Sequence, residues 1–176
     1  MELLLAWGTL FAHVVLALFL IVWFIAPKKF SGSILARSFK ENALNLAFFI
    51  ALGGTLGSLF FSTILHYEPC WLCWWQRIFL FPLVFVLGIG MLKEIKSTSL
   101  FGLPLAIVGA IIAAYHTVLQ NLPAAEIVPC TLGAVDCATP YATHFGYISI
   151  PVMSLTAFVL ILFFLVVEYR RNTGSR

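Results

Sequence analysis

Long apolar blocks alternate with short polar segments along this chain. Five blocks each approach or exceed the roughly 20 predominantly apolar residues that a membrane-spanning helix needs. They cover residues 3–25, 43–65, 74–92, 101–120 and 147–167. An open strand cannot satisfy its backbone hydrogen bonds in lipid, so each block is expected to be a helix. The pattern predicts an all-α membrane protein with five transmembrane helices.

The first block has a second interpretation, a cleaved signal peptide. It lacks the positive segment that normally precedes such a peptide, since only Glu2 comes before it, and its apolar run is longer than usual. We therefore expect a retained helix. The predicted organisation is an extra N-terminal transmembrane helix with its connector over residues 1–42, followed by a four-helix domain over residues 43–176.

Composition supports a small membrane domain and excludes several other classes. Of the 176 residues, 62% are hydrophobic and only 10% are charged, whereas soluble domains average about 45–50% and 25%. The chain is also too hydrophobic for disorder. The net charge of +3 is spread over the ends of apolar blocks. Nucleic-acid binding would require a clustered basic face, so no nucleic-acid partner is expected.

The basic residues predict the orientation in the membrane. If the five helices alternate, nine of the ten lie on one side: Lys28, Lys29, Arg37, Lys40, Lys93, Lys96, Arg170, Arg171 and Arg176. The positive-inside rule makes that side cytoplasmic. The N-terminus is then outside, the C-terminus is cytoplasmic, and residues 66–73 and 121–146 form the two outer connections.

All four cysteines lie in these two outer connections. Cys70 and Cys73 are separated by two residues, and a bridge that closes so small a loop restrains the unfolded chain little. This spacing favours redox chemistry instead. Cys73 falls at a predicted helix N-terminus, where the helix dipole favours an anion. Arg77, one turn further, is suited to stabilise a thiolate or an oxyanion, although an interfacial arginine that snorkels to the headgroups is the alternative.

The second pair, Cys130 and Cys137, encloses six residues. A structural disulfide is one interpretation, because small exterior loops are often bridged in this way. Two dithiols on one face also suggest a relay, in which thiol–disulfide exchange passes two electrons from a soluble partner to Cys70 and Cys73. A membrane quinone is the natural final acceptor at that depth, since the sequence carries no haem or flavin motif.

Two histidines lie within predicted helices. His116 is near the outer end of the fourth helix, where it either hydrogen-bonds within the bundle or acts on a quinone oxygen. Sequence alone leaves both interpretations open. His13, in the first block, has no evident partner.

Several of these segments resemble the DsbB/BdbC family of disulfide bond formation proteins. They are Pro-Cys-Trp-Leu-Cys-Trp-Trp-Gln-Arg at 69–77, His-Thr-Val-Leu-Gln at 116–120, Pro129 and Cys130 with Cys137, and Gly-Tyr-Ile-Ser-Ile-Pro at 146–151. The resemblance covers about residues 43–167. It implies a four-helix bundle in the bacterial cytoplasmic (inner) membrane, with its active cysteines on the extracytoplasmic face. Such a protein reoxidises a DsbA/BdbD-like thioredoxin-fold thiol oxidase and passes the electrons to ubiquinone or menaquinone, which supports disulfide formation in exported proteins.

The resemblance also implies a role for each site residue. Cys130 would form the mixed disulfide with the partner, and Cys137 would exchange with Cys70. Cys73 would face the quinone as a thiolate, with Arg77 and His116 near the ring. Two departures stand out, because the loop cysteines are closer together than in the best-known enterobacterial members, and the first helix is additional to the family core.

Three alternatives compete with this hypothesis. The four cysteines have the composition of a tetrahedral zinc site, although the looser second spacing and an oxidising face disfavour it. A disulfide-stapled subunit without catalysis is the second. The third is an enzyme similar to vitamin K epoxide reductase, but in that family the loop cysteines precede the Cys-x-x-Cys, whereas here they follow it.

Overall fold

The computed structural model describes residues 2–25, 34–122, 136–141 and 143–174, and these are mainly helical. The elements in chain order are α1 (Glu2–Ile25), α3 (Ile34–Glu41), α4 (Ala43–Thr63), α5 (Trp71–Leu92), α6 (Thr98–Asn121), β1 (Thr143–His144), β2 (Ile148–Ser149) and α7 (Ile150–Gly174). The predicted mainly helical architecture is confirmed.

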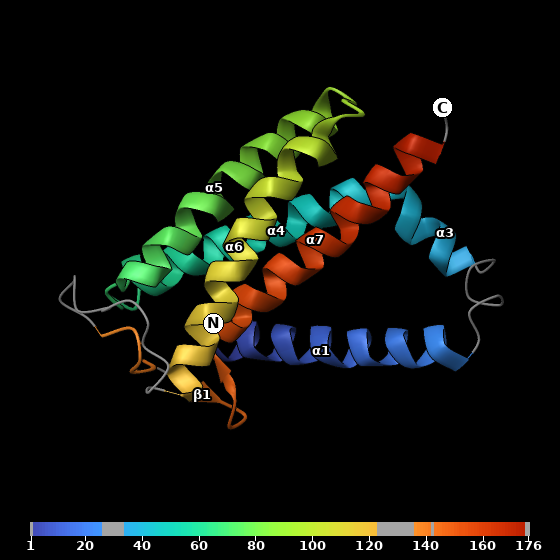
Figure 1. Ribbon diagram of the computed structural model, residues 1–176. Helices are drawn as coiled ribbons and strands as arrows, with labels where there is room; N and C mark the ends of the chain where they lie inside the picture. Colours follow the sequence, from blue (N-terminus) through green and yellow to red (C-terminus); the bar gives the residue numbers. More distant parts are fainter. Residues whose placement is uncertain (1, 26–33, 123–135, 142, 175–176) are drawn as a thin grey trace.

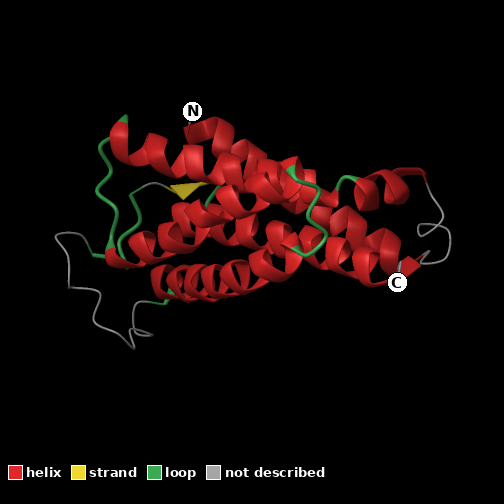
Figure 2. Cartoon of the chain, turned by 90° about the horizontal axis from the view of Figure 1, so that it is seen from above, coloured by secondary structure: helices red, strands yellow, loops and turns green. Residues whose placement is uncertain are grey.

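Helices α4, α5, α6 and α7 form a four-helix bundle. Each packs against two neighbours, because α4 contacts α5 and α7, and α6 contacts the same two helices. All four are long and apolar enough to cross a membrane, since 21 residues at about 1.5 Å each reach roughly 32 Å. Figure 1 shows the helices packed together, and Figure 2 shows the same bundle from above. The protein is therefore a multi-pass membrane protein.

Helix ends differ from the predicted ones where polar chemistry intervenes. Helix α5 begins at Trp71, three residues earlier than predicted, so Cys73 lies in its first turn. Helix α7 begins at Ile150, later than predicted, because Ile148 and Ser149 pair with β1. Pro151 then occupies the first turn, where a missing N–H costs nothing. Helix α3 was not predicted, because it is only eight residues long and largely polar.

The core of the bundle is built from large side chains against small ones. Leu83, Leu87, Phe158 and Leu165 are fully buried. Gly109 of α6 lies directly against the Phe158 ring, so an added Cβ would clash with it. Small residues on one helix thus admit large side chains from the next, as expected where lipid offers no hydrophobic driving force between helices.

Helix α1 lies outside this four-helix ring. It packs against α7 and β2, and in Figure 1 it crosses the direction of α7. Its described side chains include an apolar segment, Leu5–Val15. The helix itself is confirmed, while its passage through a membrane stays a prediction.

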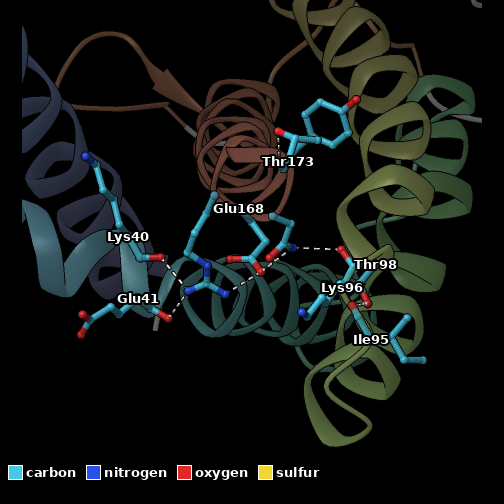
Figure 3. Close-up of polar contacts among 10 residues, drawn as sticks. Lys40, Glu41, Ile95, Lys96, Thr98, Glu168 and Thr173 are labelled. Atoms are coloured by element: carbon cyan, nitrogen blue, oxygen red, sulfur yellow. Dashed lines mark hydrogen bonds and ion pairs between the residues drawn. The ribbon is translucent and has the colours of Figure 1, made fainter. Parts of the chain in front are cut away.

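A polar network fastens the end of the bundle opposite the cysteines. Glu168 of α7 is buried and pairs with Arg171 at 2.7 Å. Arg171 also donates to the main-chain carbonyls of Lys40 and Glu41, at 3.0 and 2.8 Å. Asn172 donates to a carbonyl in the turn between α5 and α6. Figure 3 shows how these contacts join the ends of three segments that are far apart in the sequence.

Candidate active site

Cys70 and Cys73 meet at the start of α5. Cys70 is the N-cap residue, with an extended backbone, and its carbonyl accepts the first intrahelical bond from Trp74 at 3.1 Å. Cys73 lies one turn in, and the two Sγ atoms are 2.9 Å apart. Cys70 is buried and Cys73 is half-buried. The predicted juxtaposition of the two sulfurs at a helix N-terminus is therefore present.

The Cys70 thiol resists ionisation. Its hydrogen bond to Cys73, reinforced by burial, raises the pKa of the Cys70 thiol to about 12. The hydrogen bond joins the two sulfurs, and either of them can be its donor. The free N–H groups of the first turn of α5 favour an anion at this end of the helix.

His116 points at the cysteine pair from α6, and it is almost completely buried. The side-chain amide of Gln76 donates to His116 Nδ1 at 3.0 Å. The opposite nitrogen, Nε2, lies 3.2 Å from the main-chain carbonyl of Cys137 and 3.8 Å from Cys70 Sγ. A carbonyl only accepts, so the network assigns the proton to Nε2. Gln76 therefore fixes an imidazole that presents N–H to Cys70.

Cys137 reaches the same place from the second outer connection. It is buried, and its carbonyl also accepts a long hydrogen bond from Gln120 at 3.4 Å. A small cavity of about 20 Å³ is lined by Cys70, Cys73, His116 and Cys137 together. Of the second cysteine pair, Cys137 therefore lies beside Cys70 and Cys73, as predicted. Cys130 lies outside the described residues.

Arg77 is held between α4 and α5. Its Nε donates to the hydroxyl of Ser58 and one terminal nitrogen to the Ser58 carbonyl, both at 2.8 Å. The guanidinium also lies over the Trp74 ring, 5.3 Å from its centroid. Two fixed donors and a stacked face hold the half-buried cation in one orientation. This is not the loose geometry of an arginine that snorkels to headgroups.

A second, larger cavity opens beside Arg77. Its volume is about 400 Å³, and α1, α4, α5 and α7 all contribute to its walls. Cys73, Gln76 and Arg77 line it together, while most of the remaining lining is apolar or small. His116 is not part of this lining and borders only the small cavity. Cys73 borders both, so it lies between the two spaces.

Tyr141 joins the two outer connections above these cavities. Its hydroxyl donates to the Glu68 carbonyl at 3.1 Å, and its ring stacks on Tyr67 with centroids 4.8 Å apart. It lines both cavities. Tyr141 therefore couples the segment that carries Cys137 to the one that carries Cys70.

Three of these side chains also have the composition of a metal site. The candidate ligand atoms of Cys70, Cys73 and His116 all lie within 4.8 Å of one another. Two cysteines and a histidine are a known zinc ligand set. Cys137 is absent from this group in the described part of the chain. The four-cysteine site considered from the sequence also needs Cys130, which lies outside the described residues, so it stays a prediction.

Sequence reasoning missed three contributors to the site. Ser58, Gln76 and Tyr141 are not among the site residues predicted from the sequence. Gln76 carried a usable signal, because it is a polar residue inside an apolar block and lies one helical turn from Cys73. Ser58 and Tyr141 are distant in sequence from the groups they contact, and nothing local marks them.

Comparison with known proteins places this site in a family. The family model described as "Disulfide bond formation protein DsbB" matches residues 40–168. The chain is 41% identical over 122 residues to "Probable disulfide formation protein C 1" of Bacillus anthracis, which covers 69% of this chain and 88% of that protein. It is 44% identical over 117 residues to "Disulfide bond formation protein C" of Bacillus subtilis (strain 168), or 66% and 84% of the two chains.

A third relative is the "SPbeta prophage-derived disulfide bond formation protein B" of Bacillus subtilis (strain 168). It is 42% identical over 116 residues, which cover 66% of this chain and 78% of that protein. No solved structure matches the chain. The family match contains Cys70, Cys73 and the four bundle helices as far as residue 168 of α7. It implies a membrane thiol–disulfide oxidoreductase. The chain belongs to the DsbB family of disulfide bond formation proteins.

Proposed function

We propose that this protein oxidises a thioredoxin-fold thiol oxidase of the DsbA/BdbD type and passes the electrons through two cysteine pairs to a membrane quinone. The observation that carries the proposal is the position of Cys73 between two cavities. On one side lie Cys70, His116 and Cys137, and on the other lie Arg77 and a largely apolar space of about 400 Å³. Thiol–disulfide exchange would thus take place at the small cavity and acceptor binding in the larger one, and the Cys73 sulfur borders both.

The exchange steps follow the roles that the family resemblance implies for the four cysteines. A thiolate of the partner attacks the Cys130–Cys137 disulfide at Cys130, forms the mixed disulfide and releases Cys137 as a thiolate. The partner's second thiol then releases Cys130, and the partner leaves oxidised. Cys137 attacks the Cys70–Cys73 disulfide at Cys70, and Cys73 leaves as a thiolate. Cys130 resolves the Cys70–Cys137 bond, which leaves Cys70 reduced and the loop pair oxidised again.

His116 and Gln76 serve this exchange. The Nε2–H of His116 is 3.8 Å from Cys70 Sγ, so it stabilises negative charge that develops on that sulfur when the Cys70–Cys137 bond breaks. Gln76 keeps the proton on Nε2 by donating to Nδ1. The role of His116 is therefore on the exchange side, which refines the expectation that it acts near the quinone ring.

The larger cavity fits a quinone in size and chemistry. Its apolar walls suit a hydrophobic carrier, and Cys73 and Arg77 provide a thiol and a fixed cation at the same wall. A bound quinone would supply the electron sink, accepting two electrons from the Cys70 thiol and the Cys73 thiolate, with one proton from Cys70 and the second from solvent. Arg77 would bind and orient it by donating hydrogen bonds to an oxygen, and Cys70 would keep its proton until its sulfur is oxidised.

The proposed topology has five spans with the N-terminus outside and the cysteines on the extracytoplasmic face. It is supported by charge, because the described basic residues other than Arg77 lie at or near the end of the bundle opposite the cysteines, the side that the positive-inside rule assigns to the cytoplasm. Intact bacterial cells treated with a mild reductant and a membrane-impermeant maleimide should label the outer cysteines. Labelling only after the membrane is opened would contradict this orientation.

The functional test uses purified protein in nanodiscs with a reduced thioredoxin-fold oxidase and ubiquinone-1. We expect quinone absorbance to fall at a rate that requires both proteins. Cys70→Ser and Cys73→Ser should abolish turnover, and Cys130→Ser should abolish it with the protein partner while leaving quinone binding intact. Full turnover in Cys130→Ser would make the loop pair a structural disulfide.

A metal-binding function is the second candidate, because Cys70, Cys73 and His116 lie within ligating distance of a common point. Elemental analysis of the purified protein, together with free-thiol counting, separates the two functions. Stoichiometric zinc with protected Cys70 and Cys73 would favour the metal site. Freely titratable thiols without metal would favour electron transfer.

A further inference from the structure

The N-terminal helix α1 takes part in the larger cavity although it lies outside the family match. The match begins at residue 40, and α1 ends at Ile25. Four residues of α1 nevertheless line the cavity, namely Leu5, Gly8, Thr9 and Ala12. Their spacing of three and four residues places them on one face of the helix. This helix is therefore an additional wall of the space that the four-helix bundle leaves open.

Two of the α1 residues that line the cavity have small side chains or none. Gly8 and Ala12 of α1 share the lining with Gly53, Gly54 and Gly57 of α4. Among the described residues, no atom of another helix lies within 4 Å of a Cβ added at Gly8 or at Gly53. Close packing against a described neighbouring helix therefore does not account for these two glycines. Gly57 differs, since an added Cβ would touch Leu5 of α1 at 3.3 Å.

A set of specific contacts holds α1 in this place. His13 Nε2 lies 2.8 Å from the Thr156 hydroxyl, and His13 Nδ1 lies 3.1 Å from the Tyr147 hydroxyl. The Thr156 hydroxyl itself donates to the Val152 carbonyl, so His13 donates from Nε2 and accepts from Tyr147 at Nδ1. His13, which has no evident partner in the sequence, thus anchors α1 to α7.

A second contact fixes the N-terminal half of the helix. The Trp7 ring packs edge-to-face on Phe145, with centroids 4.9 Å apart. Phe145 and Gly146 lie in the three-residue turn between β1 and β2, and both have positive φ. The small wall residues of α1 are therefore held at a defined position rather than resting loosely against the bundle.

We propose that α1 completes the acceptor site and limits how large a quinone ring and its substituents can be. This inference rests on the proposed function, because it takes the cavity beside Cys73 and Arg77 as the quinone site. The helix contributes no group to the chemistry. It determines specificity by the volume that Gly8 and Ala12 leave open, and His13 is the positioning residue that maintains that volume.

The test enlarges the α1 wall and measures binding directly. Ala12→Leu and Gly8→Leu place bulk on the cavity face, and Val14→Leu is the matched control on the exposed face of the same helix, where Val14 is 50% exposed. Binding of ubiquinone-1 in nanodiscs is followed by quenching of tryptophan fluorescence. We expect at least an approximately fivefold weaker Kd in the two cavity variants, with an unchanged Kd in the control and a similar Tm in all three.

A photoreactive quinone provides a readout on the unmodified protein. We expect cross-links to map to the peptide that contains Leu5, Gly8 and Ala12, and excess ubiquinone-1 to compete them away. If the wild type binds quinone, but α1 is unlabelled and both cavity variants keep the wild-type Kd, this inference is wrong and the proposed function stands. If the wild type binds no quinone at all, the proposed function itself fails.

Discussion

The hydrogen bond between Cys70 and Cys73 makes a quantitative prediction about the reactivity of Cys70. Its pKa is raised from an ordinary value of 9.0 to about 12, first by the bond to Cys73 and then by burial. At pH 7.5 a thiol with a pKa of 9.0 is about 3% thiolate, whereas one with a pKa of about 12 is roughly a thousandfold less ionised. Cys70 should therefore be almost inert to alkylation while Cys73 is present.

Replacing Cys73 removes the largest cause of this shift. In Cys73→Ala the burial of Cys70 remains, so only part of the thousandfold suppression should be relieved. We expect iodoacetamide to alkylate Cys70 at least about tenfold faster at pH 7.5. Cys73→Ser retains a hydroxyl that accepts the S–H bond, and its increase should be smaller. The two variants together separate the hydrogen bond from the mere loss of a second sulfur.

The assay uses reduced protein in which Cys130 and Cys137 are alanines, with the modified peptides identified by mass spectrometry. In the parent protein the first alkylation should fall on Cys73. The small Cys70 signal in that protein should rise about tenfold per pH unit from pH 7 to 10 without a plateau, because a raised pKa delays ionisation. Unchanged or slower Cys70 alkylation in Cys73→Ala would refute the reasoning that the bond to Cys73 raises the pKa of Cys70.

Three further substitutions test other parts of the structure. Ser58→Ala removes the hydroxyl, one of the two Ser58 acceptors that hold Arg77. It should weaken ubiquinone-1 binding roughly fivefold. An unchanged Kd would argue that Arg77 needs no positioning by this hydroxyl. Tyr141→Phe loses the hydroxyl that ties the outer connections together, so oxidation of the protein partner should slow while quinone binding stays constant, and equal slowing of both would point to general damage. Glu168→Leu removes the buried partner of Arg171, and its free energy of unfolding, measured by thermal unfolding, should fall by about 1–3 kcal/mol. Glu168→Gln should lose less. Equal stability of the two variants would contradict a role for the buried ion pair.

The sequence was sufficient for the parts of this protein that depend on local pattern. Apolar length identified the helices of the bundle, because lipid requires about 20 apolar residues whatever the sequence detail. The spacing of Cys70, Cys73 and Arg77 was equally informative, since residues one turn apart on a helix are neighbours. Helix ends were harder. Three residues of α5 were missed because Trp71 and Leu72 follow an N-cap cysteine that carries no usual capping signal.

Long-range partners could not be predicted from local pattern. Gln76 and His116 are 40 residues apart, and His13 and Thr156 are 143 apart. Their meeting depends on which helices become neighbours and at what rotation, and neither is encoded in a window of apolar residues. For the same reason nothing in the sequence marks Gly53 of α4 as a cavity residue, although no described atom lies within 4 Å of a Cβ added there. The empty space is a property of the assembled bundle.

The most direct measurement of the central claim omits the protein partner. Protein with Cys130→Ala and Cys137→Ala, reduced at Cys70 and Cys73 and freed of reductant, is mixed with ubiquinone-1 under anaerobic conditions. The account predicts that quinol forms in an amount equal to the protein and that peptide mapping finds a new disulfide between Cys70 and Cys73. If both thiols stay reduced and no quinol appears while ubiquinone-1 is bound, the pair does not deliver electrons to a quinone and the account is contradicted.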